Sequence, residues 1–299
     1  QGKGMETDAA NKELGFDPKD IHYLLLSHAH IDHSGLIPYI YSRGFRGKIF
    51  YTPSTRDLCV LMLQDTAFIQ EQDVKWYNKK MARQHKPKIK PLFDSNHAQQ
   101  VMKHFRSVDY NTPYRIDDEI EFQFINSGHM LGSAVVHLTI KEHGETKRIA
   151  YTGDIGRLHS HILSTPQAFP QCDYLICEST YGDRLHDDEL VSEEQLLGVV
   201  EETCMYKKGK LLIPSFSVGR TQEIVYVLNE LYNDGRLERV PVYVDSPLSA
   251  NATEIFRRHA DTLNEQVRDT MRYDADPFGF NTLHYITDVQ QSKALNKSE

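Results

Sequence analysis

The chain is poor in the features of secreted and membrane proteins. Its 299 residues include only four cysteines, none in paired short spacing, and no run approaches the roughly 20 apolar residues of a membrane span. The N-terminal Gln1-Gly2-Lys3-Gly4-Met5 lacks the apolar core of a signal peptide. These absences predict reduced core thiols, no membrane association and a cytoplasmic location.

Positive charge is also scarce. Lys and Arg number 34 against 42 Asp and Glu, which leaves a net charge of −8. This balance argues against a general nucleic-acid binder, although a metal site or a local basic patch can override it. With 39% hydrophobic residues, the chain can bury one large core or two ordinary ones.

The segment from Ser27 to Gly35, by contrast, is rich in metal-binding side chains. It contains His28, His30, Asp32 and His33, directly after the apolar residues 23–26. We expect residues 23–26 to form a short buried strand and Asp32-His33-Ser34 to enter a helix, so that the ligands lie on a strand-to-helix turn. Imidazole and carboxylate together suit Zn²⁺, and the alternation predicts two metal positions. The alternative is a histidine-rich surface loop that binds metal adventitiously.

Two later residues complete this pattern. His129 follows a predicted strand in Ser-Gly-His-Met-Leu-Gly, and Asp154 follows another in Thr-Gly-Asp-Ile-Gly. Glycines at strand ends let the backbone approach a ligand closely. Each residue taken alone is better explained as an ordinary turn residue than as a ligand.

The apolar periodicity predicts a layered α/β protein. Helices are expected over 55–80, 221–231 and 250–259, with a further helix after a Ser192–Gln195 capping box. Strands are expected over 48–51, 119–125, 134–140, 148–152, 174–177 (buried), 211–214 and 242–245. We place a domain boundary near Asp187.

The order His-x-His-x-Asp-His, then His, then Asp resembles the metallo-β-lactamase superfamily. Three later segments are similar to motifs of its β-CASP nucleases: Cys177-Glu178-Ser179-Thr180-Tyr181-Gly182-Asp183-Arg184-Leu185-His186, Pro214-Ser215-Phe216-Ser217-Val218-Gly219-Arg220-Thr221-Gln222-Glu223 and Val244-Asp245-Ser246-Pro247-Leu248-Ser249. This resemblance covers residues 1 to about 260, whereas the tail 263–299 adds nothing diagnostic.

The resemblance implies an incomplete αββα metallo-β-lactamase sandwich over 1–187, without its N-terminal strands, and a partial α/β β-CASP domain over 188–299. It implies that His28, His30 and His129 hold one Zn²⁺, that Asp32 and His33 belong to a second, and that Asp154 bridges both, with Mn²⁺ as the alternative metal. Catalytic roles fall to Asp32, Asp154 and Glu178, the last by orienting a histidine; a structural salt bridge is the alternative for Glu178. The metals would activate a hydroxide that attacks an RNA phosphodiester.

Substrate contacts are expected in the second half of the chain. Ser217, Gly219 and Arg220 open a helix after a predicted strand, where backbone N–H groups and a guanidinium favour a phosphate. Ordinary capping with an exposed Arg220 is the alternative. Arg184 and His186 are expected to support the site at the domain junction.

A basic run from Lys75 to Lys90 interleaves Trp76 and Tyr77 with positive charge. Aromatic faces stack on unpaired bases while cations follow a backbone, so the run suits single-stranded RNA, and the family resemblance favours RNA over DNA. A solvated helix end is the alternative. We also expect the full-length protein to form a homodimer.

Two competing functions are a small-molecule hydrolase of the thioesterase or lactonase type and an inactive scaffold subunit of an RNA-processing complex. The roughly 110-residue insert argues against the first. The retained charged cluster argues against the second.

Relatives in this family carry further strands and histidine motifs beyond both ends of this chain, so we expect the chain to be a fragment with impaired activity.

Overall fold

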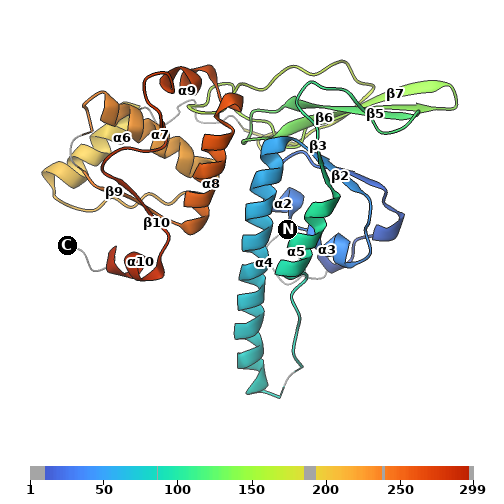
Figure 1. Cartoon of the computed structure of the whole chain (residues 1–299), viewed down its shortest axis with the longest axis horizontal. Coiled ribbons are helices and arrows are strands. Elements are labelled where there is room, and N and C mark those ends of the chain that lie inside the picture. The colour runs from blue at the N-terminus through green and yellow to red at the C-terminus, as the bar shows by residue number, and fades with distance from the viewer. Residues whose placement is uncertain (1–10, 86, 185–192, 238–239, 296–299) are drawn as a thin grey trace. The chain divides into compact units, whose positions relative to one another are not determined.

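The computed structural model describes residues 11–85, 87–184, 193–237 and 240–295. They form two compact units, which are described in turn (Figure 1). The first unit comprises the described residues up to Ser127 with 132–155 and 167–177, and the second comprises 128–131, 156–166 and those from Glu178 onward. Inside the described ranges, no helix is both long enough and apolar enough to cross a membrane.

Two sheets form the framework of the first unit. One contains three parallel strands in the order β1-β2-β3, and the other contains five strands in the order β4-β5-β6-β7-β8. Neighbours from β4 to β7 pair antiparallel, whereas β8 runs parallel to β7. The strands are β1 Tyr23–Leu25, β2 Lys48–Tyr51, β3 Phe105–Ser107, β4 Tyr114–Arg115, β5 Ile120–Asn126, β6 Ala134–Glu142, β7 Glu145–Tyr151 and β8 Tyr174–Ile176.

The main core of this unit lies between the two sheets. Phe50 on β2 is fully buried, and its ring centroid lies 5.1 Å from that of Phe122 on β5. Because side chains alternate along a strand, Phe124 joins the same cluster while Ile125 faces the other way. That opposite face of β5 is covered by Phe169 and Cys172.

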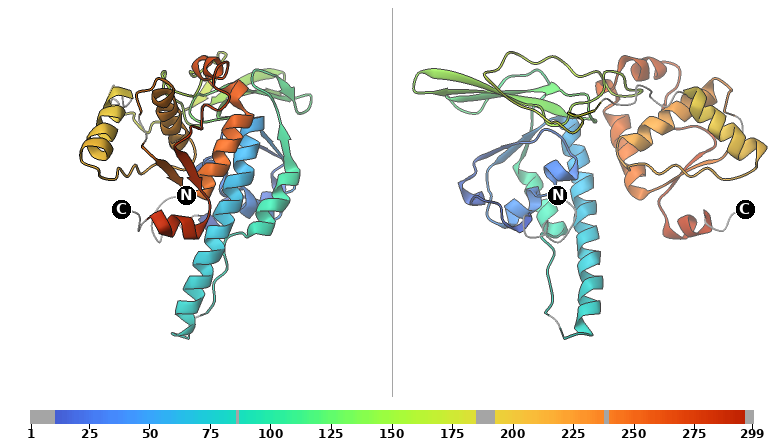
Figure 2. Two further views of the ribbon diagram at one scale, coloured as in Figure 1. Left: turned by 60° about the vertical axis from the view of Figure 1, so that its left-hand side comes forward. Right: turned by 180° about the vertical axis from the view of Figure 1, so that it is seen from behind.

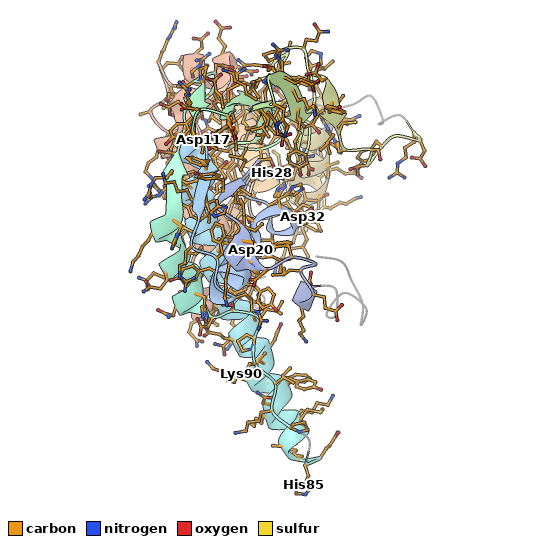
Figure 3. The ribbon with its side chains drawn as sticks, turned by 90° about the vertical axis from the view of Figure 1, so that its right-hand side faces the viewer. Asp20, His28, Asp32, His85, Lys90 and Asp117 are labelled. Atoms are coloured by element: carbon orange, nitrogen blue, oxygen red, sulfur yellow. The ribbon has the colours of Figure 1, made fainter. Side chains whose placement is uncertain are left out.

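The helices of the first unit contact the three-stranded sheet and one another. They are η1 Pro18–Asp20, α2 Ile31–Ser34, α3 Ile37–Ser42, α4 Pro53–Ala82, α5 Ser95–Val101 and η2 Met102–His104. The long helix α4 contacts β3 and α5. It begins where Thr52 accepts the N–H of Thr55 and Pro53 occupies the first turn. Its distal half extends beyond the sheets of the unit (Figures 1 and 2) and ends near His85 (Figure 3).

The second unit is built on two parallel strands, β9 Val242–Asp245 and β10 Leu283–Ile286. Its helical segments are α6 Glu193–Val200, η3 Glu201–Tyr206, α7 Arg220–Asn233, α8 Pro247–Arg258, η4 Ala260–Thr262, α9 Glu265–Thr270 and α10 Val289–Leu295. Apolar residues of α6 and α7 form its core, with Leu228 and Leu231 almost fully buried. This arrangement confirms the predicted α/β class for both parts of the chain.

Most predicted elements are present with small shifts of boundary. The strands 48–51 and 242–245 match residue for residue, and the helix expected over 55–80 spans 53–82. The strands expected over 134–140 and 148–152 also form, as β6 and β7, and they pair as a hairpin joined at Gly144. The capping box at Ser192 and the domain boundary near Asp187 lie outside the described residues.

Three expectations about the strands and one about the cysteines are wrong. Residues 211–214 form no strand, and β8 is exposed instead of buried, because it lies at the edge of its sheet with β7 as its partner. The edge position of β1 likewise leaves Tyr23 39% exposed. Cys177, expected in the core, is exposed just after β8, whereas Cys59 is buried; all four cysteines are free thiols.

Candidate metal centre

The first candidate ligands follow β1 directly. The N–H of Leu26 donates to the Phe50 carbonyl at 2.9 Å, which continues the pairing with β2, and the next three residues are buried. The chain then enters α2 at His30, whose carbonyl accepts the N–H groups of His33 and Ser34. The Ser34 hydroxyl donates to the Ala29 carbonyl at 2.8 Å and closes the turn. The predicted strand-to-helix turn is therefore confirmed.

Strands of the second sheet carry the other two ligands. His129 lies in the β5–β6 loop, whose ends are joined by a 2.9 Å hydrogen bond from the Ser127 hydroxyl to the Ser133 hydroxyl. Asp154 follows the end of β7 after Gly153. Gly153 has φ +54°, and a Cβ there would lie 2.8 Å from the Cβ of Ser27. Only glycine therefore lets this loop pass so close to the histidine turn.

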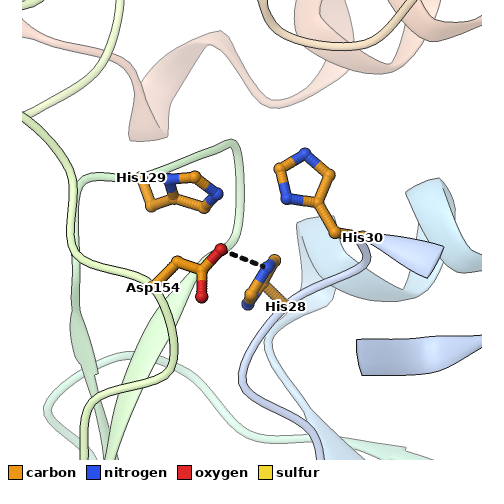
Figure 4. Close-up of side chains that lie close together, drawn as sticks. All are labelled: His28, His30, His129 and Asp154. Atoms are coloured by element: carbon orange, nitrogen blue, oxygen red, sulfur yellow. Dashed lines mark ion pairs between the residues drawn. The ribbon is translucent and has the colours of Figure 1, made fainter. Parts of the chain in front are cut away.

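Four of these side chains form a group that can hold a metal ion. One ligand atom from each of His28, His30, His129 and Asp154 lies within 4.8 Å of the others (Figure 4). His28 is buried and the other three are partly buried. Three imidazole nitrogens and one carboxylate oxygen are a donor set that suits a divalent metal, and Zn²⁺ in particular.

Asp32 and His33 lie beside this group. His33 Nε2 is 3.3 Å from Asp154 Oδ1, while His28 Nε2 is 3.7 Å from Asp154 Oδ2. The two carboxylate oxygens of Asp154 thus approach different histidines, as a bridging carboxylate would. Asp32 Oδ2 is 3.7 Å from His33 Nε2, and its side chain is 60% exposed. All six predicted ligands are therefore brought together, and their individual ligand roles remain predictions.

Ser27 fixes the orientation of the buried imidazole. Its hydroxyl lies 3.1 Å from His28 Nδ1, which leaves Nε2 directed toward Asp154. Tyr151, at the end of β7, also interacts with Ser27. Burial raises the pKa of the Tyr151 hydroxyl, and the carboxylates of Asp154 and Asp32 raise this pKa further. The sequence placed Ser27 at the start of the motif but gave no indication of this role.

The motif after β8 is described only in part. Glu178 accepts a 2.7 Å hydrogen bond from the Thr180 hydroxyl and is not among the four grouped ligands. The Arg184 guanidinium lies 4.9 Å from the centroid of the Tyr181 ring. His186 lies outside the described residues. The expected roles of these three residues stay predictions.

The predicted phosphate site is a well-capped helix start. Ser217 and Ser246 hydroxyls lie 3.2 Å apart, and Gly219 adopts φ +89° just before α7. Arg220 donates to Glu223 one turn further along the helix at 2.6 Å. The guanidinium expected to meet a phosphate is thus held by a neighbouring carboxylate.

Sequence reasoning missed Gln222, which organises this helix start. It is fully buried; its Oε1 accepts the Gly219 N–H at 2.7 Å, and its Nε2 donates to the Ser217 and Ser249 carbonyls and the Thr253 hydroxyl. One amide thereby ties the loop before α7 to α8. The capping position of Gln222, three residues after Gly219, was the available signal.

Comparisons with known proteins match both parts of the chain. A model of the metallo-beta-lactamase superfamily matches residues 4–49, and a model of the Beta-Casp domain matches residues 221–299. The second match includes the tail beyond residue 260, so the expectation that this tail is uninformative is wrong.

Curated relatives extend along most of the chain. Ribonuclease TTHA0252 of Thermus thermophilus is 31% identical over 99% of this chain and 63% of its own length. Transcription termination factor FttA of Methanothermobacter thermautotrophicus is 32% identical over 92% of this chain and 41% of its own length. An RNase J-like protein of Methanocaldococcus jannaschii is 32% identical over 94% of this chain and 59% of its own length. The chain therefore spans between about two fifths and 63% of the relatives it matches.

Proposed function

The chain belongs to the β-CASP family of the metallo-β-lactamase superfamily, and on that premise we propose that it is the catalytic part of a metal-dependent ribonuclease. The observation that carries the proposal is the group of His28, His30, His129 and Asp154, whose ligand atoms lie within 4.8 Å of one another. The names of two relatives, a ribonuclease and an RNase J-like protein, support RNA as the substrate.

The residues of the chain have separable tasks in this proposal. His28, His30, His129 and Asp154 would hold one Zn²⁺, and Asp32 and His33 would hold a second with the other carboxylate oxygen of Asp154. Bound metal supplies Lewis-acid charge and lowers the pKa of water toward neutrality. Ser27 keeps the Nε2 atom of His28 directed into the site. Glu178 is assigned as a positioning residue for a histidine, and Arg220 as a phosphate contact.

The other expectations stand as parts of the same proposal. Single-stranded RNA is favoured over DNA, and a cytoplasmic location is supported by the four free thiols. A homodimer of the full-length protein remains a prediction. A small-molecule hydrolase is disfavoured because the Beta-Casp match covers 221–299. An inactive scaffold is disfavoured because all six candidate ligands are present and close together.

The experiment compares site variants with matched controls for bound zinc and for cleavage of end-labelled RNA. His30→Gln and Asp154→Asn should lose zinc and cleavage. His143→Gln and Asp118→Asn make the same chemical changes on side chains that are 92% and 96% exposed in turns, and should keep both. Product lengths distinguish endonuclease from exonuclease cleavage. Cleavage that survives Asp154→Asn at full rate would contradict the proposal.

A further inference from the structure

The distal end of helix α4 concentrates positive charge in a chain that is acidic as a whole. Residues 74–93, which we call the basic arm, contain no Asp or Glu. The chain's net charge is −8, yet this one segment carries seven cations: Lys75, Lys79, Lys80, Arg83, Lys86, Lys88 and Lys90. Such a local imbalance attracts an anionic partner whatever the net charge of the molecule.

The described residues of the basic arm, 74–85 and 87–93, form two limbs. Asn78 on α4 donates to the Ile89 carbonyl and accepts the Ile89 N–H, each at 2.9 Å, so the returning limb is held beside the helix. Met81 is 8% exposed at this junction. Figure 3 shows Lys90 alongside the helix and His85 at the far end. Closer to the sheets, the N–H and hydroxyl of Ser95 donate to Glu71 and lower its pKa.

An exposed aromatic ring lies on the same helix face as the cations. Trp76 is 65% exposed, and Tyr77 beside it is 38% exposed. Lys79, Lys80 and Arg83 follow Trp76 by three, four and seven positions, a spacing that places them on one face of a helix. The Lys80 ammonium lies 5.2 Å from the centroid of the Trp76 ring. The face therefore offers a flat apolar surface edged by positive charge.

This combination fits one class of partner better than others. Cations match the backbone of any nucleic acid, but an exposed indole can stack only on a base that is not already paired and stacked. An acidic protein would use the cations and leave the ring without a role. Because the proposed function makes RNA the substrate, we propose that the basic arm is a docking surface for single-stranded RNA, separate from the metal centre.

Trp76 is the single tryptophan of the chain, so its fluorescence reports on the basic arm alone. Metal-free protein in chelator is titrated with an unstructured oligoribonucleotide and with the same sequence as a duplex. Single-stranded RNA should quench the emission of Trp76, and duplex RNA should not. Absence of quenching at RNA concentrations that saturate binding would overturn the proposal, as would equal quenching by the duplex.

Variants test the same surface by affinity. Trp76→Ala should weaken RNA binding about 5- to 150-fold, the effect of losing one stacked base, whereas Trp76→Phe should retain most of it. The triple variant K79A/K80A/R83A should lower the salt dependence of log K by about 2, since each phosphate contact to a single strand contributes about 0.7.

The matched control removes three exposed cations elsewhere in the first unit, as K48A/K103A/K141A, and so changes the net charge equally. This control should leave the salt dependence of RNA binding unchanged. If the control lowers the salt dependence as much as K79A/K80A/R83A does, the assignment of RNA binding to the basic arm is overturned. Cleavage is measured separately with metal present. RNA binding that stays normal in the arm variants would overturn the docking surface alone, whereas cleavage that survives Asp154→Asn at full rate would overturn the ribonuclease proposal alone.

Discussion

At the scale of single residues, two buried polar side chains act as supports: Ser27 contacts His28 of the metal centre, and Gln222 holds the start of α7. Histidine and aspartate in such close spacing after a strand are typical of metal sites, so the six candidate ligands could be named from the sequence. Ser27 and Gln222 could not, because serine and glutamine are common in turns and on surfaces, and their importance comes from burial. Ser27 is 2% exposed and Gln222 is fully buried.

Ser27→Ala should reduce zinc affinity without unfolding the protein. The Ser27 hydroxyl contacts His28 Nδ1 at 3.1 Å, and loss of such an outer partner typically costs about 10–100-fold in metal affinity. Competition with a chromogenic chelator measures the affinity, and Ser42→Ala, which removes a hydroxyl that donates to the Tyr39 carbonyl on α3, is the control. Equal zinc affinity in Ser27→Ala and the unmodified chain would show that the imidazole needs no such support.

At the scale of elements, periodicity predicted helices and antiparallel strands well and failed for isolated apolar runs. The apolar periodicity of α4 extends over many helical turns, and β5, β6 and β7 are consecutive antiparallel strands. Residues 211–214 and 174–176 are short apolar runs whose burial depends on neighbours distant in sequence. The first forms no strand, and in the second Tyr174, Leu175 and Ile176 are each more than half exposed.

The start of α7 permits a paired test of the predicted phosphate contact. Glu223 holds Arg220 at 2.6 Å, so Glu223→Gln should free the guanidinium and strengthen RNA binding. Arg220→Ala should weaken binding by about 1.5–3 kcal/mol, the value of a hydrogen bond to a charged group. Arg115→Ala is the control, because Arg115 pairs with Asp118 at the same spacing and distance. If Arg220→Ala binds RNA as tightly as Arg115→Ala, Arg220 makes no contact with RNA and only pairs with Glu223.

Gln222→Leu should destabilise the second unit by about 2–4 kcal/mol. The substitution keeps a buried side chain of similar size but leaves the Gly219 N–H and two carbonyls without their amide partner. Denaturant unfolding measures the loss. Gln266→Leu, on an exposed position of α9, should change stability by less than about 0.5 kcal/mol. If Gln222→Leu also lowers the free energy of unfolding by less than about 0.5 kcal/mol, water replaces the hydrogen bonds of the amide.

At the scale of the whole molecule, composition bounded the class of protein but could not locate its surfaces. A net charge of −8 gives no indication of the basic arm, and the apolar content does not separate buried residues from exposed ones. The tail 263–299 could be assigned to a domain only by comparison with known proteins, because the Beta-Casp match extends to residue 299. The order of residues located the basic run from Lys75 to Lys90, but the exposure of Trp76 and the pairing of Asn78 with Ile89 come only from the structure.

The edge of the five-stranded sheet should control self-association of the chain. At β8, Tyr174, Leu175 and Ile176 are 57%, 53% and 57% exposed, and the strand lies last in the order of its sheet. An apolar edge strand with open hydrogen-bonding groups is a template for pairing with another copy, and a lysine there disfavours pairing. Leu175→Lys should therefore shift sedimentation profiles from oligomer toward monomer. Phe68→Lys, which places the same charge on a side chain that is 56% exposed on α4, should not. An equal shift in both variants would show that association follows net charge rather than strand pairing.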